Sequence, residues 1–327
     1  APTSRVSYTD LATPDILVRR NDAFTRLLQR CERLPPVTCA IVHPCDRDSL
    51  LGPIEAAKRG LIIPILVGPE EKIRAVADAE GLDLAPYQLV ATEHSHAAAT
   101  KAVAMVRAGE AQSLMKGSLH TDELLKAVVP SATGLRTARR MSHAFLLDVP
   151  TYARPVIITD AAINIAPILE EKADIVQNAI DLARTLGVAS PRVAILAAVE
   201  TVNSKMQSTL DAAALCKMAE RGQIKGGILD GPLAFDNAIS ERAAAIKKIR
   251  SDVAGKADIL LAPDLEAGNM LVKQLQYLAG ADAAGIVLGT RAPIVLTSRA
   301  DTVRVRLAST AVLKLVAHAQ SGVLGDG

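Results

Sequence analysis

The sequence predicts an α/β protein in which helices cover both faces of a mainly parallel sheet. Short apolar runs alternate with longer segments of helical periodicity along most of the chain, a pattern typical of β-α-β units. Half of the 327 residues are hydrophobic and 22% are charged. This composition indicates a large buried core and excludes a disordered chain. At roughly 100–200 residues per domain, the length indicates two domains.

The first part of the chain is predicted to contain four strand–helix pairs after a polar N-terminal lead-in. Gly60 follows one helical segment and is a typical helix end, and Asp122 and Glu123 suit the first turn of another helix. We expect strands at 39–44, 62–68, 87–92 and 113–117, and helices at 52–60, 70–81, 96–109 and 121–129.

The alternation is interrupted between residues 131 and 160, where we place a change of domain. Two strand-like runs, 141–150 and 154–160, are separated by only three residues. A connection this short suits an antiparallel pair, because parallel strands need a long crossover.

The alternation then resumes and continues to the end of the chain. Segment 169–187 is an amphipathic helix that ends on a glycine. We expect strands at 192–199, 226–232, 257–263, 285–289 and 293–297, and further helices at 204–222, 238–250, 265–280 and 301–319.

Ligands of open α/β sheets bind beyond the carboxyl ends of the strands. The polar residues at these ends carry both signs of charge, which suits a small anionic substrate. They are Lys116, Ser118, Asp160, Asn164, Glu200, Asp230, Asp236, Asp264, Ser298 and Arg299. No GxGxxG follows a strand and no GxxxxGK[ST] occurs, so the common dinucleotide and P-loop fingerprints are absent.

Two short segments could bind phosphate, and each has a plain alternative. Segment 115–118 could offer backbone N–H groups to an anion, or could be a tight turn with an exposed lysine. Arg136, Arg139 and Arg140 could bind phosphate oxygens, or could lie in a solvated loop.

His143 sits within an apolar run, so we expect a hydrogen-bonded core histidine. Of the acids in 229–240, Asp236 suits a helix cap and Asp230 suits a site.

Segment 297–309, TSRADTVRVRLAS, places arginines at the start of a helix, where positive charge is unfavourable. A bound anion near Ser298 and Arg299 would offset that charge. The alternative is a simple N-cap by Ser298 or Asp301, with the arginines in solvent.

The composition also limits the partners and the compartment. A net charge of +2 and 2% aromatic residues give no support to nucleic-acid binding. No apolar run reaches the ~18 residues that span a bilayer, so we expect no membrane partner. The four cysteines show no zinc-site spacing, and we expect reduced thiols in a cytoplasmic protein and no bound metal.

Several of these stretches together resemble the phosphate acetyltransferase and phosphate butyryltransferase family, especially the transferase part of enoyl-CoA hydratase/phosphate acetyltransferase proteins. The similarity extends from about residue 38 to the final helix. The matching stretches are HPCDRDSLLGPIEAAKRGLIIPILVGP (43–69), LMKGSLHTDELLKAV (114–128), GLRTARRMSHAFLLD (134–148), ITDAAINIAP (158–167), ILDGPLAFDNAIS (228–240), PDLEAGNMLVKQLQYLAGADAAG (263–285) and LTSRAD (296–301).

The resemblance implies a two-domain fold like that of isocitrate and isopropylmalate dehydrogenases, with the active site in the cleft between domains. The first domain would comprise residues 15–148 and 292–327, and the second 149–291. It also implies a homodimer. The implied reaction is reversible transfer of a short acyl group, acetyl foremost, between coenzyme A and inorganic phosphate. Coenzyme A and acyl-CoA are then substrates, as are phosphate and acyl phosphate, and no cofactor is required.

The resemblance also assigns roles to individual residues. Arg299 would bind the phosphoryl group and Ser298 would orient the thiol or the acyl carbonyl. The acetyltransferases carry an aspartate seven positions after that serine as base, but here the position is Val305, so we expect Asp301 to be the base. The resemblance assigns substrate and phosphate binding to Lys116, Ser118, Arg136, Arg139, Ser142, Asp160, Asn164, Asp230 and Asn269.

Three alternatives remain open at the level of sequence. The segment SRAD is closer to the butyryltransferases, which favours a longer acyl chain. The missing aspartate is also compatible with a catalytically impaired protein that binds CoA or an anion. A metal-dependent decarboxylating dehydrogenase would instead require Asp230, Asp236 and Asp264 to hold a divalent cation.

Overall fold

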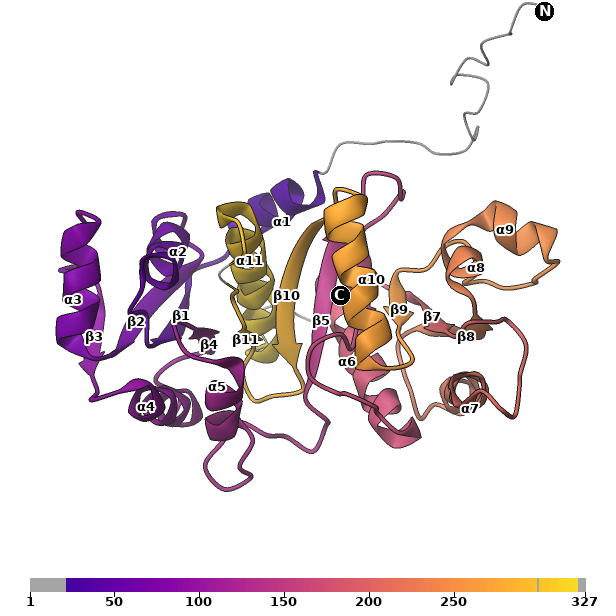
Figure 1. The fold of residues 1–327 in the computed structure, drawn as a ribbon, viewed down its shortest axis with the longest axis horizontal. Helices are drawn as coiled ribbons and strands as arrows, with labels where there is room; N and C mark the ends of the chain where they lie inside the picture. The colour runs from indigo at the N-terminus through magenta and orange to yellow at the C-terminus, as the bar shows by residue number, and fades with distance from the viewer. Residues whose placement is uncertain (1–21, 299, 323–327) are drawn as a thin grey trace, which may run out of the picture.

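The computed structural model describes residues 22–298 and 300–322. Eleven strands of these residues form one twisted sheet that runs the length of the molecule (Figure 1). Their order across the sheet is β3 (Gln88–Ala91), β2 (Ile62–Gly68), β1 (Val37–Val42), β4 (Ser113–Lys116), β11 (Ile294–Val295), β10 (Asp282–Leu288), β5 (Ser142–Asp148), β6 (Val156–Thr159), β9 (Ile259–Leu261), β7 (Arg192–Leu196) and β8 (Ile228–Leu233).

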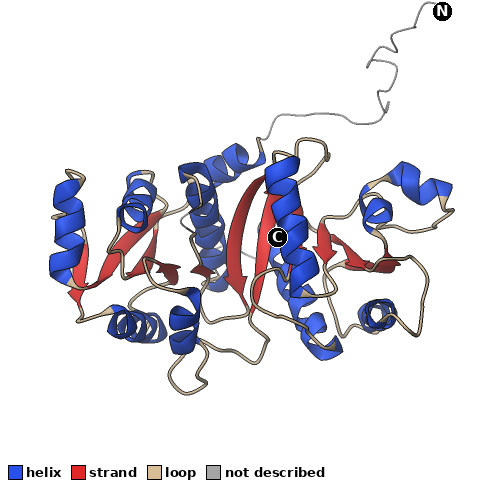
Figure 2. Cartoon of the chain, viewed as in Figure 1, coloured by secondary structure: helices blue, strands red, loops and turns tan. Residues whose placement is uncertain are grey.

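Helices flank the strands along the whole sheet (Figure 2). They are α1 (Ala23–Cys31), α2 (Arg47–Lys58), α3 (Glu70–Ala79), α4 (Ser95–Arg107), α5 (Thr121–Val128), α6 (Leu169–Thr185), α7 (Gln207–Glu220), α8 (Phe235–Ile239), α9 (Glu241–Ile246), α10 (Leu265–Leu278) and α11 (Val303–Gln320). None of the helices in the described ranges is both long and apolar enough to span a bilayer.

The predicted α/β class is confirmed, with parallel strands on both flanks and an antiparallel centre. The antiparallel pair expected at 141–150 and 154–160 is present as β5 and β6. Three details differ from the sequence prediction. Helix α1 lies between the polar lead-in and the first expected strand, where we predicted no element. Helix α2 begins near residue 47 because Asp46 and Ser49 form a capping box. The helix expected at 238–250 is two short helices, because Ser240 has extended backbone and caps the second.

Alternate residues of each buried strand pack against different helical layers, as the period of two requires. In β1, Cys39 and Ile41 join a core that includes α2, α3, α6 and α11. Ala40 and Val42 face the opposite side and pack against α4 and α5. On that second side, α8–α10 cover the far end of the sheet in a separate core. The second side therefore carries two helical layers, one toward each end of the sheet.

Only two residues of β11 connect the two ends of the sheet. Ile294 pairs with Leu114 of β4 on one side and with Val287 of β10 on the other. Helix α11 packs against β10 and β11 at this narrow point. The domain limits at 148/149 and 291/292 stay a prediction, although the cavity described next lies close to this junction.

Candidate functional site

A cavity of about 950 Å³ opens at the centre of the sheet, between the helical layers of its second side. Its floor is formed by β5 and β10, and its walls by the start of α2, the β4–α5 loop, the C-terminal half of α10 and the start of α11. Of the predicted site residues, Lys116, Ser118, Ser298 and Asp301 line this cavity. Four candidates from two distant segments are therefore brought together at the carboxyl ends of β4 and β11.

Ser118 fixes one wall by joining two loops. Its hydroxyl donates to the carbonyl oxygen of His43 at 2.8 Å and accepts from the backbone N–H of Cys45 at 3.2 Å. Gly117 lets these loops approach, since a Cβ there would stand 2.2 Å from the carbonyl oxygen of Val42. The Lys116 ammonium donates to the carbonyl oxygen of Leu119 at 3.1 Å. The β4–α5 loop thereby holds the positively charged Lys116 side chain at the wall of the cavity.

Ser298 and Asp301 form a closed turn between β11 and α11. The carboxylate of Asp301 accepts from the backbone N–H of Ser298 at 2.7 Å, and the N–H of Asp301 donates to the carbonyl oxygen of Ser298 at 3.0 Å. The N-cap of α11 is Thr302, whose hydroxyl accepts from Val305, so neither Ser298 nor Asp301 caps this helix. Arg299 lies outside the described residues.

Sequence reasoning assigned no role to Arg306, and exposure of the arginines to solvent was one of two alternatives. Its guanidinium donates to the carbonyl oxygens of Asp48 at 2.6 Å and Ser298 at 3.1 Å, and its side chain is 11% exposed. It thereby ties the Ser298 turn to α2, and it lines the cavity.

Val305 lines the cavity as well, so the position where the acetyltransferases carry an acid faces the site. Arg304 pairs instead with Asp282 at 2.9 Å.

His143 lies on the floor of the cavity, on β5, and is 3% exposed. Burial lowers its pKa to about 4, against an opposing contribution from the charge of Asp160. The imidazole is therefore neutral at neutral pH. Its Nδ1 has no hydrogen-bond partner among the residues that the structure describes. This differs from the hydrogen-bonded core histidine that we expected.

Asp160 and Asn164 are adjacent to the cavity but are already engaged in the fold. The Asp160 carboxylate is 3% exposed and accepts from the backbone N–H groups of His143, Ala162, Ile163 and Asn164 and from the Asn164 side chain. The Asn164 side-chain oxygen accepts from Arg140 at 2.8 Å. These two residues shape the loop after β6, whose Ala162 lines the cavity.

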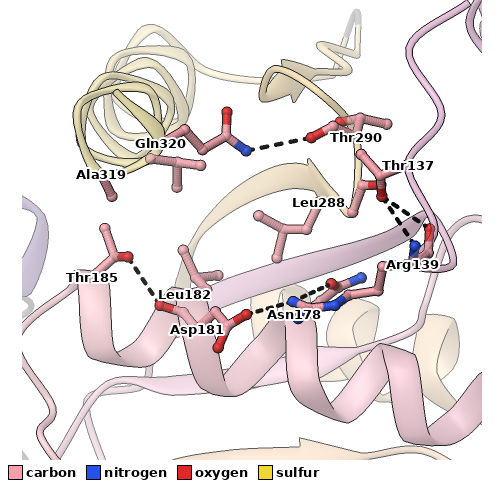
Figure 3. A pocket seen from close by; sticks show the side chains of 12 residues that line it. Thr137, Arg139, Asn178, Asp181, Leu182, Thr185, Leu288, Thr290, Ala319 and Gln320 are labelled. Carbon is pink, nitrogen blue, oxygen red and sulfur yellow. Dashed lines mark hydrogen bonds and ion pairs between the residues drawn. The ribbon is translucent and has the colours of Figure 1, made fainter. Parts of the chain in front are cut away.

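Three further candidates lie on the other side of β5. Arg139 forms an ion pair with Asp181 of α6 at 2.5 Å and lines a separate pocket of about 350 Å³ with Asn178 (Figure 3). The buried hydroxyl of Ser142 accepts from Asn178 at 2.8 Å. Arg136 is exposed and bridges to Thr290. The structure does not bring these residues to the main cavity.

The remaining acidic and amide candidates are spread over different elements. Asp230 lies on the edge strand β8 and accepts from the N–H of Gly231. Asp236 lies in the first turn of α8 without capping it, and Asp264 caps α10. Asn269 donates to the carbonyl oxygen of Ala161 at 3.2 Å. No cluster of three metal-ligating side chains occurs within residues 22–298 and 300–322.

Comparison with known sequences identifies relatives along nearly the whole chain. Residues 88–313 match the family described as phosphate acetyl/butaryl transferase. A phosphate acetyltransferase of Rhizobium meliloti is 63% identical over 294 residues, which cover 90% of this chain and 93% of that protein. A phosphate butyryltransferase of Clostridium beijerinckii is 42% identical, with coverages of 90% and 97%.

Solved structures show the same fold. A branched-chain phosphotransacylase from Enterococcus faecalis V583 superposes with a TM-score of 0.75 at 31% identity, covering 86% of this chain and 99% of that one. A protein described as a 4-hydroxythreonine-4-phosphate dehydrogenase from Salmonella typhimurium gives a TM-score of 0.53 at 11% identity, with coverages of 86% and 100%. The second similarity concerns the fold alone and agrees with the dehydrogenase-like architecture expected from the sequence.

Proposed function

This chain belongs to the phosphate acetyl/butaryl transferase family, and on that basis we propose that it transfers an acetyl group reversibly between coenzyme A and inorganic phosphate. The observation that carries the proposal is the Ser298–Asp301 turn, which lies with Lys116 in the central cavity. The relative named phosphate acetyltransferase is more similar than the one named phosphate butyryltransferase, which supports acetyl as the acyl group.

The reaction is an attack by the thiol sulfur of CoA on the carbonyl carbon of acetyl phosphate. Asp301 takes the thiol proton, the sulfur–carbon bond forms, and the carbon–oxygen bond to phosphate breaks. Asp301 then gives the proton to the departing phosphate, so the enzyme is unchanged. A carboxylate within hydrogen-bond reach of the thiol can carry out both transfers. No covalent enzyme intermediate is needed when both substrates bind together.

We assign the binding of the substrates to Arg299 and Ser298. Arg299 binds the phosphoryl group and stabilises its charge as the bond to carbon breaks. The Ser298 hydroxyl oxygen accepts from the N–H of Ala300 at 3.3 Å, which leaves its O–H to donate to the acyl carbonyl or to the thiol. Arg306 keeps this turn in place by binding the carbonyl oxygen of Ser298. Lys116 adds positive charge at the cavity wall beside this turn.

We propose that the reaction uses no metal ion and no redox group. Coenzyme A takes part as a substrate and is not a cofactor. We also propose a homodimer in the cytoplasm. Helix α10 carries apolar side chains that are exposed in a single chain, with Met270 at 61% and Leu278 at 83%, and an apolar surface of this kind supports an interface.

The direct test is the synthesis of acetyl-CoA from acetyl phosphate and CoA, followed by the ultraviolet absorbance of the thioester. We expect synthesis that is undiminished by a chelator and severely reduced in Arg299→Ala, with an unchanged thermal unfolding temperature. Unchanged kinetics of this variant would remove Arg299 from the mechanism. Chelator-sensitive synthesis would contradict a metal-free reaction.

A further inference from the structure

His143 is a polar side chain that the fold buries without a complete set of partners. Its Nδ1 is buried and has no hydrogen-bond partner within the described part of the chain. A buried polar atom without a partner destabilises the folded state, because it has lost its hydrogen bond to water. Such a cost calls for an explanation in ligand binding or chemistry. The ring lies at the cavity that holds Ser298 and Asp301, so its second nitrogen, Nε2, is the atom that a bound substrate can contact.

The ring is held in place by its neighbours on the sheet. His143 and Phe145 lie on one face of β5, with ring centroids 4.5 Å apart. Gly285 of β10 stands directly opposite Phe145. A Cβ on Gly285 would lie 2.8 Å from Cε1 and 3.0 Å from Nε2 of His143. Glycine at this position therefore lets the ring pack closely against β10, and Gly285 itself lines the cavity.

The position of the ring determines which nitrogen carries the proton. The imidazole is neutral at neutral pH, because burial lowers its pKa to about 4. A proton on Nδ1 would be a buried donor without an acceptor. Nε2 is not among the buried atoms that lack a partner within the described residues, and the ring lines the cavity, so a ligand there can accept a proton from Nε2. The favoured tautomer therefore has an N–H at Nε2.

We propose that His143 is a further catalytic residue, which donates its Nε2–H to the acyl carbonyl oxygen of the substrate; this inference rests on the proposed acyl transfer. When the thiol sulfur bonds to the carbonyl carbon, the π electron pair of the carbonyl moves to oxygen. The hydrogen bond from His143 stabilises that negative charge. The pair returns when phosphate leaves. His143 keeps its proton throughout, and the thiol proton moves through Asp301 to phosphate.

A neutral imidazole suits this role better than proton abstraction from the thiol. In this tautomer the nitrogen that could accept a proton is Nδ1, which is buried, so His143 is not placed to take the proton of the thiol. A neutral histidine can polarise a carbonyl group without giving up its proton. Val305, at the position where the acetyltransferases carry an acid, leaves the proton transfer to Asp301, so the two residues have separate tasks.

The test compares two amides of different length at position 143. The side-chain nitrogen of glutamine can reach the place of Nε2, whereas that of asparagine stands near Nδ1. We expect H143N to lower kcat by about 10²- to 10³-fold, the usual loss of one oxyanion donor, with KM for CoA and acetyl phosphate changed less than about threefold. We expect H143Q to recover about tenfold or more of that loss.

A matched control separates catalysis from burial. His318 is 4% exposed, its Nδ1 also has no partner among the described residues, and its Nε2 lies 2.8 Å from the carbonyl oxygen of Pro35, away from the cavity. H318Q is expected to keep the parental kcat. Circular dichroism and thermal unfolding confirm that each variant is folded before kinetics are compared.

A spectroscopic measurement decides the proposal independently of rate. The infrared carbonyl stretch of bound ¹³C-labelled acetyl-CoA should lie at lower frequency in the parent protein than in H143N, because the hydrogen bond weakens the double bond. Equal frequencies, or a parental kcat in H143N, would overturn the inference. A parent protein without acetyl transfer would instead contradict the proposed function, and the carbonyl frequency would still decide the role of His143.

Discussion

Asp301 combines a structural contact with the proposed role as base, and one substitution separates the two. Asp301→Asn keeps a side-chain oxygen that can accept from the N–H of Ser298, now at 2.7 Å, so the turn is preserved. The amide cannot take a proton from the thiol. We expect kcat to fall by about 10²-fold or more and the low-pH limb of the pH–rate profile to disappear.

Steady-state kinetics of acetyl-CoA synthesis over a range of pH check this prediction. The parent protein and Asp301→Asn are compared at equal thermal unfolding temperature. A pH–rate profile in the variant that matches the parent would exclude Asp301 as the base and leave the thiol proton to another group.

The burial of His143 also predicts how stability depends on pH. The folded state binds a proton at His143 only near pH 4, whereas the unfolded chain binds one near pH 6.5. Between these values the unfolded state holds more protons, so the free energy of unfolding falls as the pH is lowered. The contribution of this group approaches about 1.4 kcal/mol per pH unit. The stability that depends on the neutral imidazole of His143 is fully present above pH 6.5.

Urea unfolding of the parent and of H143Q across this pH range measures the effect. The variant should lose stability less steeply than the parent as the pH falls from 6.5 toward 4. Parallel curves for the two proteins would contradict a neutral, buried imidazole.

Residue patterns alone predicted part of this site. Lys116 and Ser118 were proposed from their place after β4, and Ser298 from its place after β11, whereas Asp301 was proposed as base only from the family resemblance. The position of a residue in sequence gives no information on which neighbours use its polar atoms. Asp160 is an example, since its carboxylate accepts five hydrogen bonds within the protein. The incomplete partners of His143 depend on β10 packing beside β5, which a local pattern cannot show.

At the scale of elements, α11 depends on a buried lysine. Lys314 is 0% exposed and its ammonium donates to the carbonyl oxygens of Cys31, Leu34 and Gly60 at 2.7–2.9 Å. These contacts join α11 to the end of α1 and to the turn after α2. Lys314→Met fills the same space but leaves three acceptors without a donor. We expect a loss of about 3 kcal/mol or more in the free energy of unfolding.

Chemical denaturation measures this loss, with Lys101→Met on the exposed side of α4 as the control that removes a lysine without removing such contacts. A Lys314→Met protein as stable as the control would show that the three carbonyl contacts contribute little.

Most elements follow from periodicity, because buried strands and amphipathic helices carry strong local patterns. Helix α1 was not predicted from periodicity. Its nine residues follow a polar segment, and its apolar face is recognisable only from the packing of α1 against α11. The division of 238–250 into α8 and α9 depends on the conformation of a single residue, Ser240. Strand β11 has only two paired residues, although the run predicted for it extends over 293–297.

At the scale of the whole molecule, the exposed apolar face of α10 predicts assembly. Met270 and Leu278 are eight residues apart, which places them on neighbouring parts of one helix face. Replacing both with glutamate should convert a dimer of the parent chain into a monomer, as measured by light scattering after size-exclusion chromatography. Val129→Glu, at an exposed apolar residue at the end of α5, is the control. An unchanged mass in the double variant would contradict an interface at α10.

The reaction of the whole molecule is tested most directly by acyl release from CoA with and without phosphate. Free thiol is measured with acetyl-, propionyl- and butyryl-CoA as substrates. We expect turnover that requires inorganic phosphate and is fastest with acetyl-CoA. No phosphate-dependent thiol release from any of the three substrates would contradict it.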